Sequence, residues 1–416
     1  MQKCKFFMGN TKGMKSCSQE KGRQMNALFG AIRNKLNFLA IRIAIVCVAC
    51  SPVGVLAAPA ITGVGGTVGN GQTITISGAG FGSTGPTVVV FDDFEKGSSG
   101  TTLSSVQRAA QIGFWDNLSA TMGPLYPTYS NTYARSGSLS MKSDWSDNGA
   151  WEGGRLVQAN LGGATQVYAS WWMYLPANRN VPGTSIGSPN WKIFWIYANP
   201  WPASDYVCTF LDNVNSGYLS CGVCDDQNAP LRADFGPVAD TLTTATSFVK
   251  GTWMRYEVYL VGSSTGGIIN WWETSATRAR IQRANKTGVN TMHTGEPWVY
   301  FHLPGYGRGD TGSQTYYDDA YIAKGPGALA RVEIGNNATY SNCTNIAVIT
   351  PTSWSSNSIT ATVRQGGFAA GSSAYLFVID SAGAASPGYP VTIGSGGPAL
   401  APATLLAPTG LRILTN

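Results

Sequence analysis

The sequence predicts an all-β protein, and three observations support this. Charged residues make up only 12% of the 416 residues, whereas 51 residues are Gly and 13 are Trp. This composition is typical of short strands joined by tight turns. Alternating runs such as 73–76 and 375–378 recur, and no segment after residue 60 repeats its apolar residues with the period of a helix. A chain of this length has room for two domains with flanking segments.

The first 57 residues have the features of an export signal. A basic stretch ends at Arg42, an apolar run covers 43–49, and small residues lead to Ala57, after which we expect cleavage. The apolar run is shorter than the roughly 20 residues that span a bilayer. Translation that starts at Met25 and a lipoprotein acylated at Cys50 stay open as alternatives. We expect an exported protein, secreted or at the cell surface, that meets the membrane only through this segment.

The net charge of the whole chain is misleading. It is +6, but the first 57 residues hold nine Lys/Arg and a single acid, Glu20, which gives that segment a net charge of +8. The remainder therefore carries the difference, −2. Phosphate binding needs clustered Lys and Arg, so we exclude nucleic acid as a partner.

Four cysteines follow the export signal: Cys208, Cys221, Cys224 and Cys343. An oxidising compartment permits two disulfides among them, in any of three pairings. The Cys221–Cys224 spacing also suits a zinc site, but both His residues are distant in the sequence. We favour a local disulfide within 208–224.

Two segments far apart in the sequence look like halves of one domain. The run "ITGVGGTVGNGQTITISGAGFG" near the start and the strands at 352–363 and 373–380 resemble an IPT/TIG domain, an immunoglobulin-like sandwich. We therefore predict one split domain, 58–90 with 328–394, into which residues 91–327 are inserted. Insertion needs the ends of the guest to be close, so we expect 91–95 and 316–322 to be neighbouring strands. Two domains in series are the alternative.

The inserted segment resembles the concanavalin A-like lectin/glucanase superfamily, including its alginate-lyase-like and laminin-G-like members. The segments that carry this resemblance are "FDDFEKG", "TWMRYEVYL", "GGIINWWETS" and "YYDDAYIA". The resemblance implies an antiparallel jelly-roll β-sandwich beside the smaller immunoglobulin-like β-sandwich, and it leaves the activity open. Residues 395–416 are rich in Gly, Pro and Ala and read as a flexible tail.

Aromatic residues indicate a sugar-binding groove. Twelve of the thirteen Trp lie between 115 and 298, and sugars stack on exposed rings. Because alternate strand residues share a face, a curved, concave sheet could present two such sets to water. Filling of the core is the alternative for any one Trp. The predicted substrate-binding residues are Trp298, Tyr300, Arg255, Glu257, Tyr259, Trp151 and Trp172.

A lyase is the enzyme that the sequence favours. The E-x-D-x-x-E pattern of the superfamily's glucanases is absent, which argues against glycoside hydrolysis. The run "YFHLPGY" resembles the "YFKAGVY" strand of alginate-lyase-like jelly rolls, which implies that Tyr306 is catalytic. Elimination also needs a base and a group that neutralises the uronate carboxylate, and His302 and Arg155 suit these roles by chemistry alone. The Arg-rich and "QIH" strands of that family are absent.

Two acidic pairs predict a structural cation. Asp92 and Asp93 lie on the first strand of the guest, and Asp318 and Asp319 lie on its last. Four carboxylates on adjacent strands would repel one another unless solvated or bridged, and Ca²⁺ is the hard cation that favours oxygen ligands.

Three functions stay open at this point. We expect a monomeric polysaccharide-binding protein, with a polysaccharide or cell-surface glycan as its partner. The alternatives are a polysaccharide lyase acting on a uronate-containing glycan and a non-catalytic surface adhesin or structural protein.

Overall fold

The computed structural model describes residues 58–394 apart from 104–105, 120–125, 147–150, 153–155, 183–190, 199–204, 214–217, 226–248, 290, 293–294, 305–306 and 309–311. The predicted export signal and tail lie outside the described residues. The regular secondary structure of the described part consists of β-strands and one short 3-10 helix, η2 (Tyr340–Asn342). This confirms the all-β prediction. Within these ranges, no helix has the length and apolarity needed to cross a membrane.

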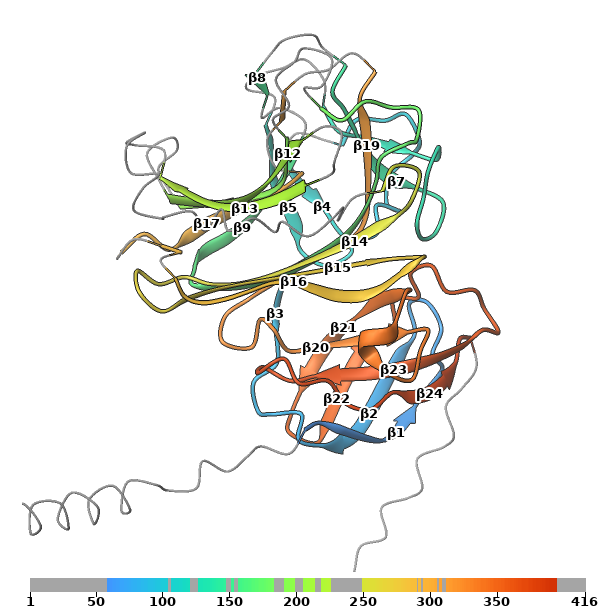
Figure 1. The fold of residues 1–416 in the computed structure, drawn as a ribbon. Coiled ribbons are helices and arrows are strands. Elements are labelled where there is room, and N and C mark those ends of the chain that lie inside the picture. Colours follow the sequence, from blue (N-terminus) through green and yellow to red (C-terminus); the bar gives the residue numbers. More distant parts are fainter. Residues whose placement is uncertain are drawn as a thin grey trace, which may run out of the picture. The chain divides into compact units, whose positions relative to one another are not determined.

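Both ends of the described chain form one seven-stranded antiparallel sheet, seen in blue and in orange to red in Figure 1. Its strand order is β1-β2-β22-β21-β20-β23-β24. One buried apolar cluster draws on β1, β2, β20, β22 and β23, so the sheet folds over its own core as a small sandwich. The strands are β1 (Ala60–Gly65), β2 (Thr73–Ala79), β20 (Arg331–Gly335), β21 (Ile346–Trp354), β22 (Ser358–Thr362), β23 (Ser373–Ile379) and β24 (Tyr389–Thr392).

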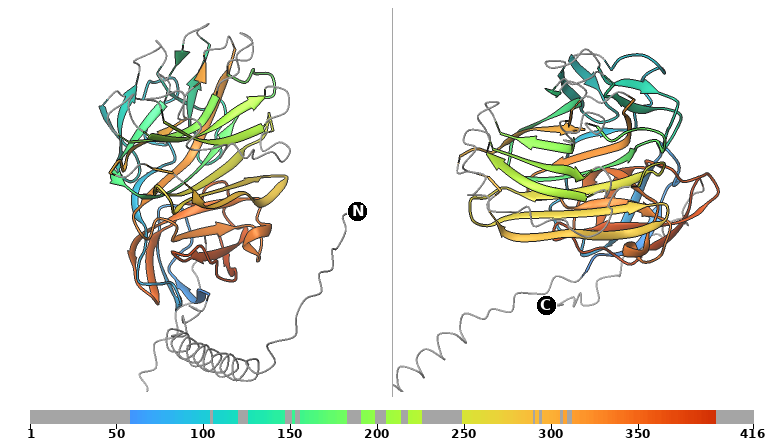
Figure 2. Two further views of the ribbon diagram at one scale, coloured as in Figure 1. Left: turned by 60° about the vertical axis from the view of Figure 1, so that its left-hand side comes forward. Right: turned by 45° about the horizontal axis from the view of Figure 1, so that its top comes forward.

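The segment between these strands forms two further antiparallel sheets, which enclose the largest apolar core (Figure 2). The first, of eight strands, has the order β16-β15-β14-β10-β19-β7-β6, with β3 also paired to β19. Its strands are β3 (Thr87–Asp92), β6 (Thr128–Ser130), β7 (Ser140–Asp144), β10 (Gln166–Tyr174), β14 (Met254–Val261), β15 (Gly267–Ser275), β16 (Arg278–Val289) and β19 (Gln314–Lys324).

The second sheet has nine strands in the order β13-β12-β11-β17-β9-β5-β4, with β18 paired to β11 and β8. Together the two sheets make the jelly-roll sandwich that the sequence predicted. The strands of the second sheet are β4 (Val106–Ala109), β5 (Phe114–Ser119), β8 (Trp151–Glu152), β9 (Leu156–Ala164), β11 (Trp191–Tyr197), β12 (Asp205–Asn213), β13 (Tyr218–Asp225), β17 (Trp298–Leu303) and β18 (Gly307–Arg308).

The first and last strands of the jelly roll are neighbours, as expected for an inserted domain. β3 pairs antiparallel with β19, and Phe91 lies opposite Tyr321. One expected boundary was wrong, however. Residues 87–90 were assigned to the immunoglobulin-like module, but they belong to β3 and extend the jelly-roll sheet opposite Ile322–Lys324. Their alternating apolar pattern fits either sandwich, so the sequence alone does not choose the partner strand.

Five of the described Trp side chains fill the interior of the jelly roll. Trp171 lies at its centre, with the rings of Phe194, Tyr256 and Trp271 each about 6 Å away. The core-filling alternative therefore holds for these five residues. The fully buried Trp residues of this core are Trp115, Trp145, Trp171, Trp271 and Trp298.

Candidate functional site

The outer face of β14 is covered, which corrects the predicted groove. Alternation placed Arg255, Glu257 and Tyr259 on the face opposite the core, and the structure agrees with that placement. All three are nevertheless buried, at 1%, 0% and 8% exposure, because the immunoglobulin-like module packs on this face. The packed module occupies the space that a glycan would need on this face, so the assignment of these three residues to substrate binding was wrong.

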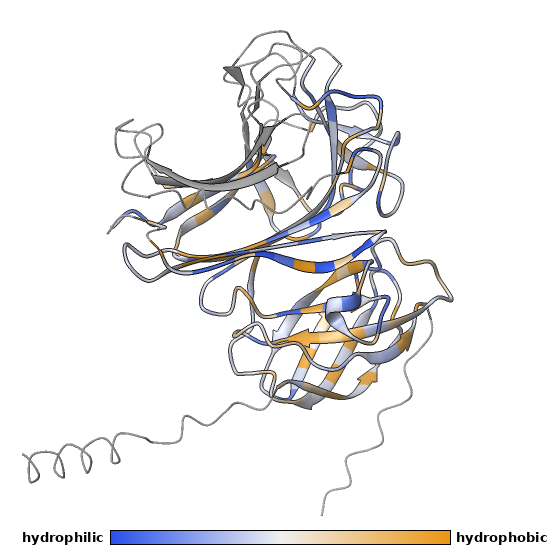
Figure 3. Ribbon diagram, in the orientation of Figure 1, coloured by the Kyte–Doolittle hydropathy of each residue, from blue (hydrophilic) through white to orange (hydrophobic). Residues whose placement is uncertain are grey.

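A network of ion pairs joins the two modules at this covered face. Arg255 pairs with both Glu257 of its own strand and Glu333 of β20. Arg280 of β16 donates to Glu257 at 2.7 Å, and Arg331 pairs with Glu333 at 3.2 Å. Figure 3 shows hydrophilic residues on β15 and β16 among hydrophobic ones. Paired charges can be buried where unpaired ones cannot.

Rings complete the contact between the modules. The Arg280 guanidinium lies 4.7 Å from the ring centroids of both Trp272 and Tyr340, and Arg331 lies 4.4 Å from that of Tyr168. Burial alone would raise the pKa of Glu257, but the surrounding guanidinium groups, Arg255 first, lower it to about 2. The carboxylate is therefore ionised at neutral pH.

Trp172 and Trp298 were also misassigned. Trp172 lies on the outer face of β10, is 2% exposed, and has the Arg135 guanidinium 4.2 Å from its ring centroid. Trp298 was expected to share a face with Tyr300, but it is 0% exposed and packs in the core. A register shift explains this: Trp298 lies opposite Ala164 and Tyr300 opposite Asn160. Because of this irregularity, Trp298 faces the core, whereas Tyr300 two residues later faces outward.

The outer face of the nine-stranded sheet carries a polar and aromatic row. Trp195 of β11 lies opposite His302 of β17, which lies opposite Gln158 of β9. Their strand neighbours, such as Phe194 and Phe301, belong to the core, so the row faces outward. The Trp195 and His302 rings have centroids 6.2 Å apart, and His302 Nε2 lies 2.9 Å from Gln158 Oε1.

This row is mostly enclosed and adjoins a more open edge. Trp195, His302 and Gln158 are each 7% exposed. Beside them, half-buried Tyr300 lies opposite exposed Asn160, whose amide donates to Asp116 at 3.3 Å. We call these six residues, Trp195, His302, Gln158, Tyr300, Asn160 and Asp116, the outer row. It combines rings, amides, an imidazole and a carboxylate on one face.

His302 is neutral at physiological pH. Burial lowers its pKa to about 3, because the charged imidazolium loses its hydration. If Gln158 presents its Oε1 to the ring as the hydrogen bond indicates, Nε2 carries the proton. A neutral imidazole cannot neutralise a carboxylate by charge, so His302 does not supply that role.

Sequence reasoning missed four members of this row, Asp116 among them. Gln158, Asn160 and Trp195 were not predicted, although Val157, Ala159 and Leu161 alternate with the two amides and mark β9 as a one-sided strand. That alternation was a usable signal. For Trp195, a register shift in β11 between Lys192 and Trp195 obscures the pattern.

Several predicted residues cannot be placed. Tyr306 and Arg155 lie outside the described residues, as does the side chain of Trp151, whose backbone begins β8. The side chains of Cys208, Cys221 and Cys224 are likewise not described, so their pairing stays a prediction. Cys343 is buried and is a free thiol.

The four aspartates do not converge on one point. Asp92 accepts hydrogen bonds from Phe94 N and Trp115 Nε1, one at each carboxylate oxygen. Asp318 likewise accepts from backbone N–H groups at both oxygens. Asp93 and Asp319 line a common pocket, whose described lining does not include Asp92 or Asp318. Across the part of the chain that the structure describes, no group of three or more His, Cys, Asp or Glu is arranged to ligate a metal, and calcium stays a prediction.

Comparison with known proteins gives likeness in fold only. No protein-family model matches the sequence, and no curated protein matches it. Among solved structures, alginate lyase Aly36B is 12% identical, covers 58% of this chain and 98% of its own, and has a TM-score of 0.38. A GH131 β-glucanase catalytic domain from Podospora anserina is 13% identical, covers 57% and 96%, and has a TM-score of 0.33. Lectin I-B4 from Griffonia simplicifolia is 9% identical, covers 48% and 92%, and has a TM-score of 0.29.

Proposed function

We propose that this protein binds a polysaccharide on the outer face of its nine-stranded sheet. One observation carries the proposal: rings, amides and a carboxylate gather in the outer row, whereas the equivalent face of the other sheet is covered. A sugar offers flat C–H faces to rings such as Tyr300 and hydroxyls to amides such as Asn160. The immunoglobulin-like module then acts as a spacer that holds the opposite face.

A glycan array probed with the purified chain tests this proposal. Tyr300 is half-buried and is the ring of the row most open to solvent. The Tyr300→Ala variant should therefore lose about ten-fold or more in affinity for the glycan that the wild type binds, since lost stacking of about 1.4 kcal/mol gives that factor. Tyr126→Ala is the matched control, because Tyr126 is 38% exposed outside the row. Equal losses in both variants, or no glycan bound by the wild type, would contradict the proposal.

A polysaccharide lyase is the second candidate, and the pairing of His302 with Gln158 favours it. A neutral imidazole and an amide in one enclosed row could hold a uronate, with Tyr306 as the acid and Arg155 as the neutralising cation. The test is a screen of uronate-containing glycans for the ultraviolet absorbance of an unsaturated product. If the wild type binds a glycan but forms no such product at any pH tried, the lyase is excluded and the binding function remains.

A further inference from the structure

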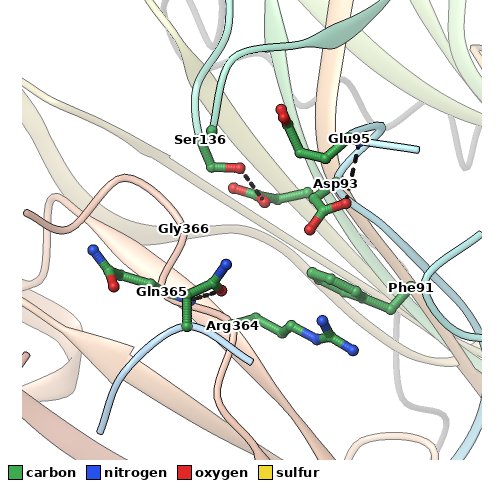
Figure 4. Close-up of a pocket in the computed structure, with 10 residues that line it drawn as sticks. Phe91, Asp93, Glu95, Ser136, Arg364, Gln365 and Gly366 are labelled. Carbon is green, nitrogen blue, oxygen red and sulfur yellow. Dashed lines mark hydrogen bonds between the residues drawn. The ribbon is translucent and has the colours of Figure 1, made fainter. Parts of the chain in front are cut away.

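A pocket lies where β3 and β19 of the jelly roll meet the loop at 364–366 of the immunoglobulin-like module. Its volume is about 190 Å³. Figure 4 shows Asp93 and Ser136 on one side of it, facing Arg364 and Gln365 on the other. Since liquid water occupies about 30 Å³ per molecule, this space equals about six waters, which is too large for a bare ion.

Asp319 lines this pocket and carries an unsatisfied carboxylate oxygen. Its side chain is only 8% exposed, and its Oδ1 accepts a hydrogen bond from Ser136 at 2.8 Å. Its Oδ2 has no hydrogen-bond partner among the described residues. The backbone of Asp319 is also strained, with a φ of 48°. A buried carboxylate oxygen without a donor is costly, and such strain is typical of functional positions.

Arg364 supplies the opposite charge. Its guanidinium lies 5.1 Å from the ring centroid of Phe91, and its Nε lacks a partner within the described part of the chain. Burial lowers the pKa of Arg364, and the charge of Asp93 in the same pocket acts against that lowering. The pocket therefore presents an unpaired acceptor and an unpaired donor of opposite charge.

The other carboxylates of the pocket do not make a metal site. Glu95 accepts from the Ser138 and Leu139 backbone N–H groups through Oε1, and from the Ser138 hydroxyl through Oε2. Asp93 accepts from Glu95 N and Gln111 through Oδ1. Two available carboxylates beside an arginine are a poor set for a divalent cation, which takes six to eight oxygen ligands as Ca²⁺.

We propose that this junction pocket binds a small zwitterion, whose ammonium group donates to Asp319 and Asp93 and whose carboxylate pairs with Arg364. Phe91 gives the carbon chain between these groups an apolar surface. The occupant bridges the two modules, because Asp319 belongs to the jelly roll and Arg364 to the immunoglobulin-like module. This site is separate from the outer row, so neither proposal depends on the other.

Matched probes test the charge pattern. Isothermal titration of the full chain would use glycine, β-alanine and γ-aminobutyrate, each compared with an amine and a carboxylate of the same length that carry only one charge. We expect at least one zwitterion to bind at least ten-fold more tightly than both of its single-charge counterparts. Binding of the amine alone with equal affinity, or of none of the zwitterions, would overturn the proposal.

Variants tie the binding to the pocket. Asp319→Asn and Arg364→Gln should each weaken binding of that zwitterion at least ten-fold, whereas Glu296→Gln, a carboxylate-to-amide change elsewhere, should leave it unchanged. Two variants on opposite walls keep the test valid should one of them fail to fold. Titration with Ca²⁺ alone is the last arm. If the chain binds calcium and Asp319→Asn abolishes that binding, the zwitterion proposal is overturned and the calcium site predicted from the acidic pairs is supported.

Discussion

The two outer faces of the jelly roll have the same strand chemistry and different surroundings. On β14, Arg255 and Glu257 alternate with core residues, just as His302 alternates with Phe301 on β17. The first face meets the immunoglobulin-like module and pairs its charges with Glu333 and Arg331. The second face holds a row of polar and aromatic groups beside an open edge. The comparison teaches that a strand face rich in polar residues is suited to contact a partner. That partner can be another module of the same chain, as on β14, or a separate molecule, as proposed for β17.

Breaking the covered face should have the largest effect. Glu257→Gln removes the carboxylate that holds Arg255 and Arg280, and leaves buried guanidinium groups uncompensated. We expect a loss of about 3–5 kcal/mol in the free energy of unfolding, measured by urea denaturation. Glu296→Gln is the control and should change stability by less than about 0.5 kcal/mol. A loss under about 1 kcal/mol for Glu257→Gln would contradict the role of this carboxylate in compensating the buried guanidinium groups.

The stability contributed by the outer row should depend on pH. In the folded protein His302 is neutral, with a pKa of about 3. In the unfolded chain it has its ordinary pKa of about 6.5 and becomes protonated as the pH falls below that value. Its contribution to stability is therefore complete above about pH 6.5 and falls by up to about 1.4 kcal/mol for each pH unit below that. The difference in Tm between wild type and His302→Gln should shrink from pH 7 to pH 4. A constant difference would mean that the imidazole is solvated.

The junction pocket should have the smallest effect on stability, and its pH dependence should be opposite to that of His302. Burial raises the pKa of Asp319 to about 6, against the lowering influence of Ser136 and Arg135 and with Asp93 raising it further. An acid whose pKa is raised by folding contributes stability that is complete below its ordinary pKa. This contribution is lost as the pH rises through the raised pKa, about 6 here. Asp319→Asn should therefore raise Tm by a few degrees at pH 7 and by little at pH 4, without ligand. A lower Tm at pH 7 would contradict this. The charged groups that act on Asp319 are Asp93, Asp318, Arg135 and Arg255.

Local pattern was enough to predict the fold and to divide strand faces, but not to say what covers them. The alternation in 254–261 placed Met254, Tyr256, Val258 and Leu260 in the core correctly. The burial of Arg255 and Glu257 depends on Glu333, which lies far along the chain, and period-2 alternation carries no information about such a partner.

Irregular backbone limited the site prediction further. Trp298 and Tyr300 share a face by simple alternation, but the shift in register opposite Ala164 and Asn160 separates them. Gly162 and Gly163, both with positive φ, lie on β9 within that shift. Adjacent glycines in a strand are a signal of a bulge that sequence reasoning could have used.

Hydrogen exchange with and without the bound glycan tests the central claim most directly. The array would supply the glycan, and mass spectrometry of the full chain would map which peptides become protected. The account predicts protection of β9, β11 and β17, with β14, β15 and β16 unchanged because the other module already shields them. Protection confined to β14–β16, or spread equally over both sheets, would contradict the assignment of the glycan site to the nine-stranded sheet.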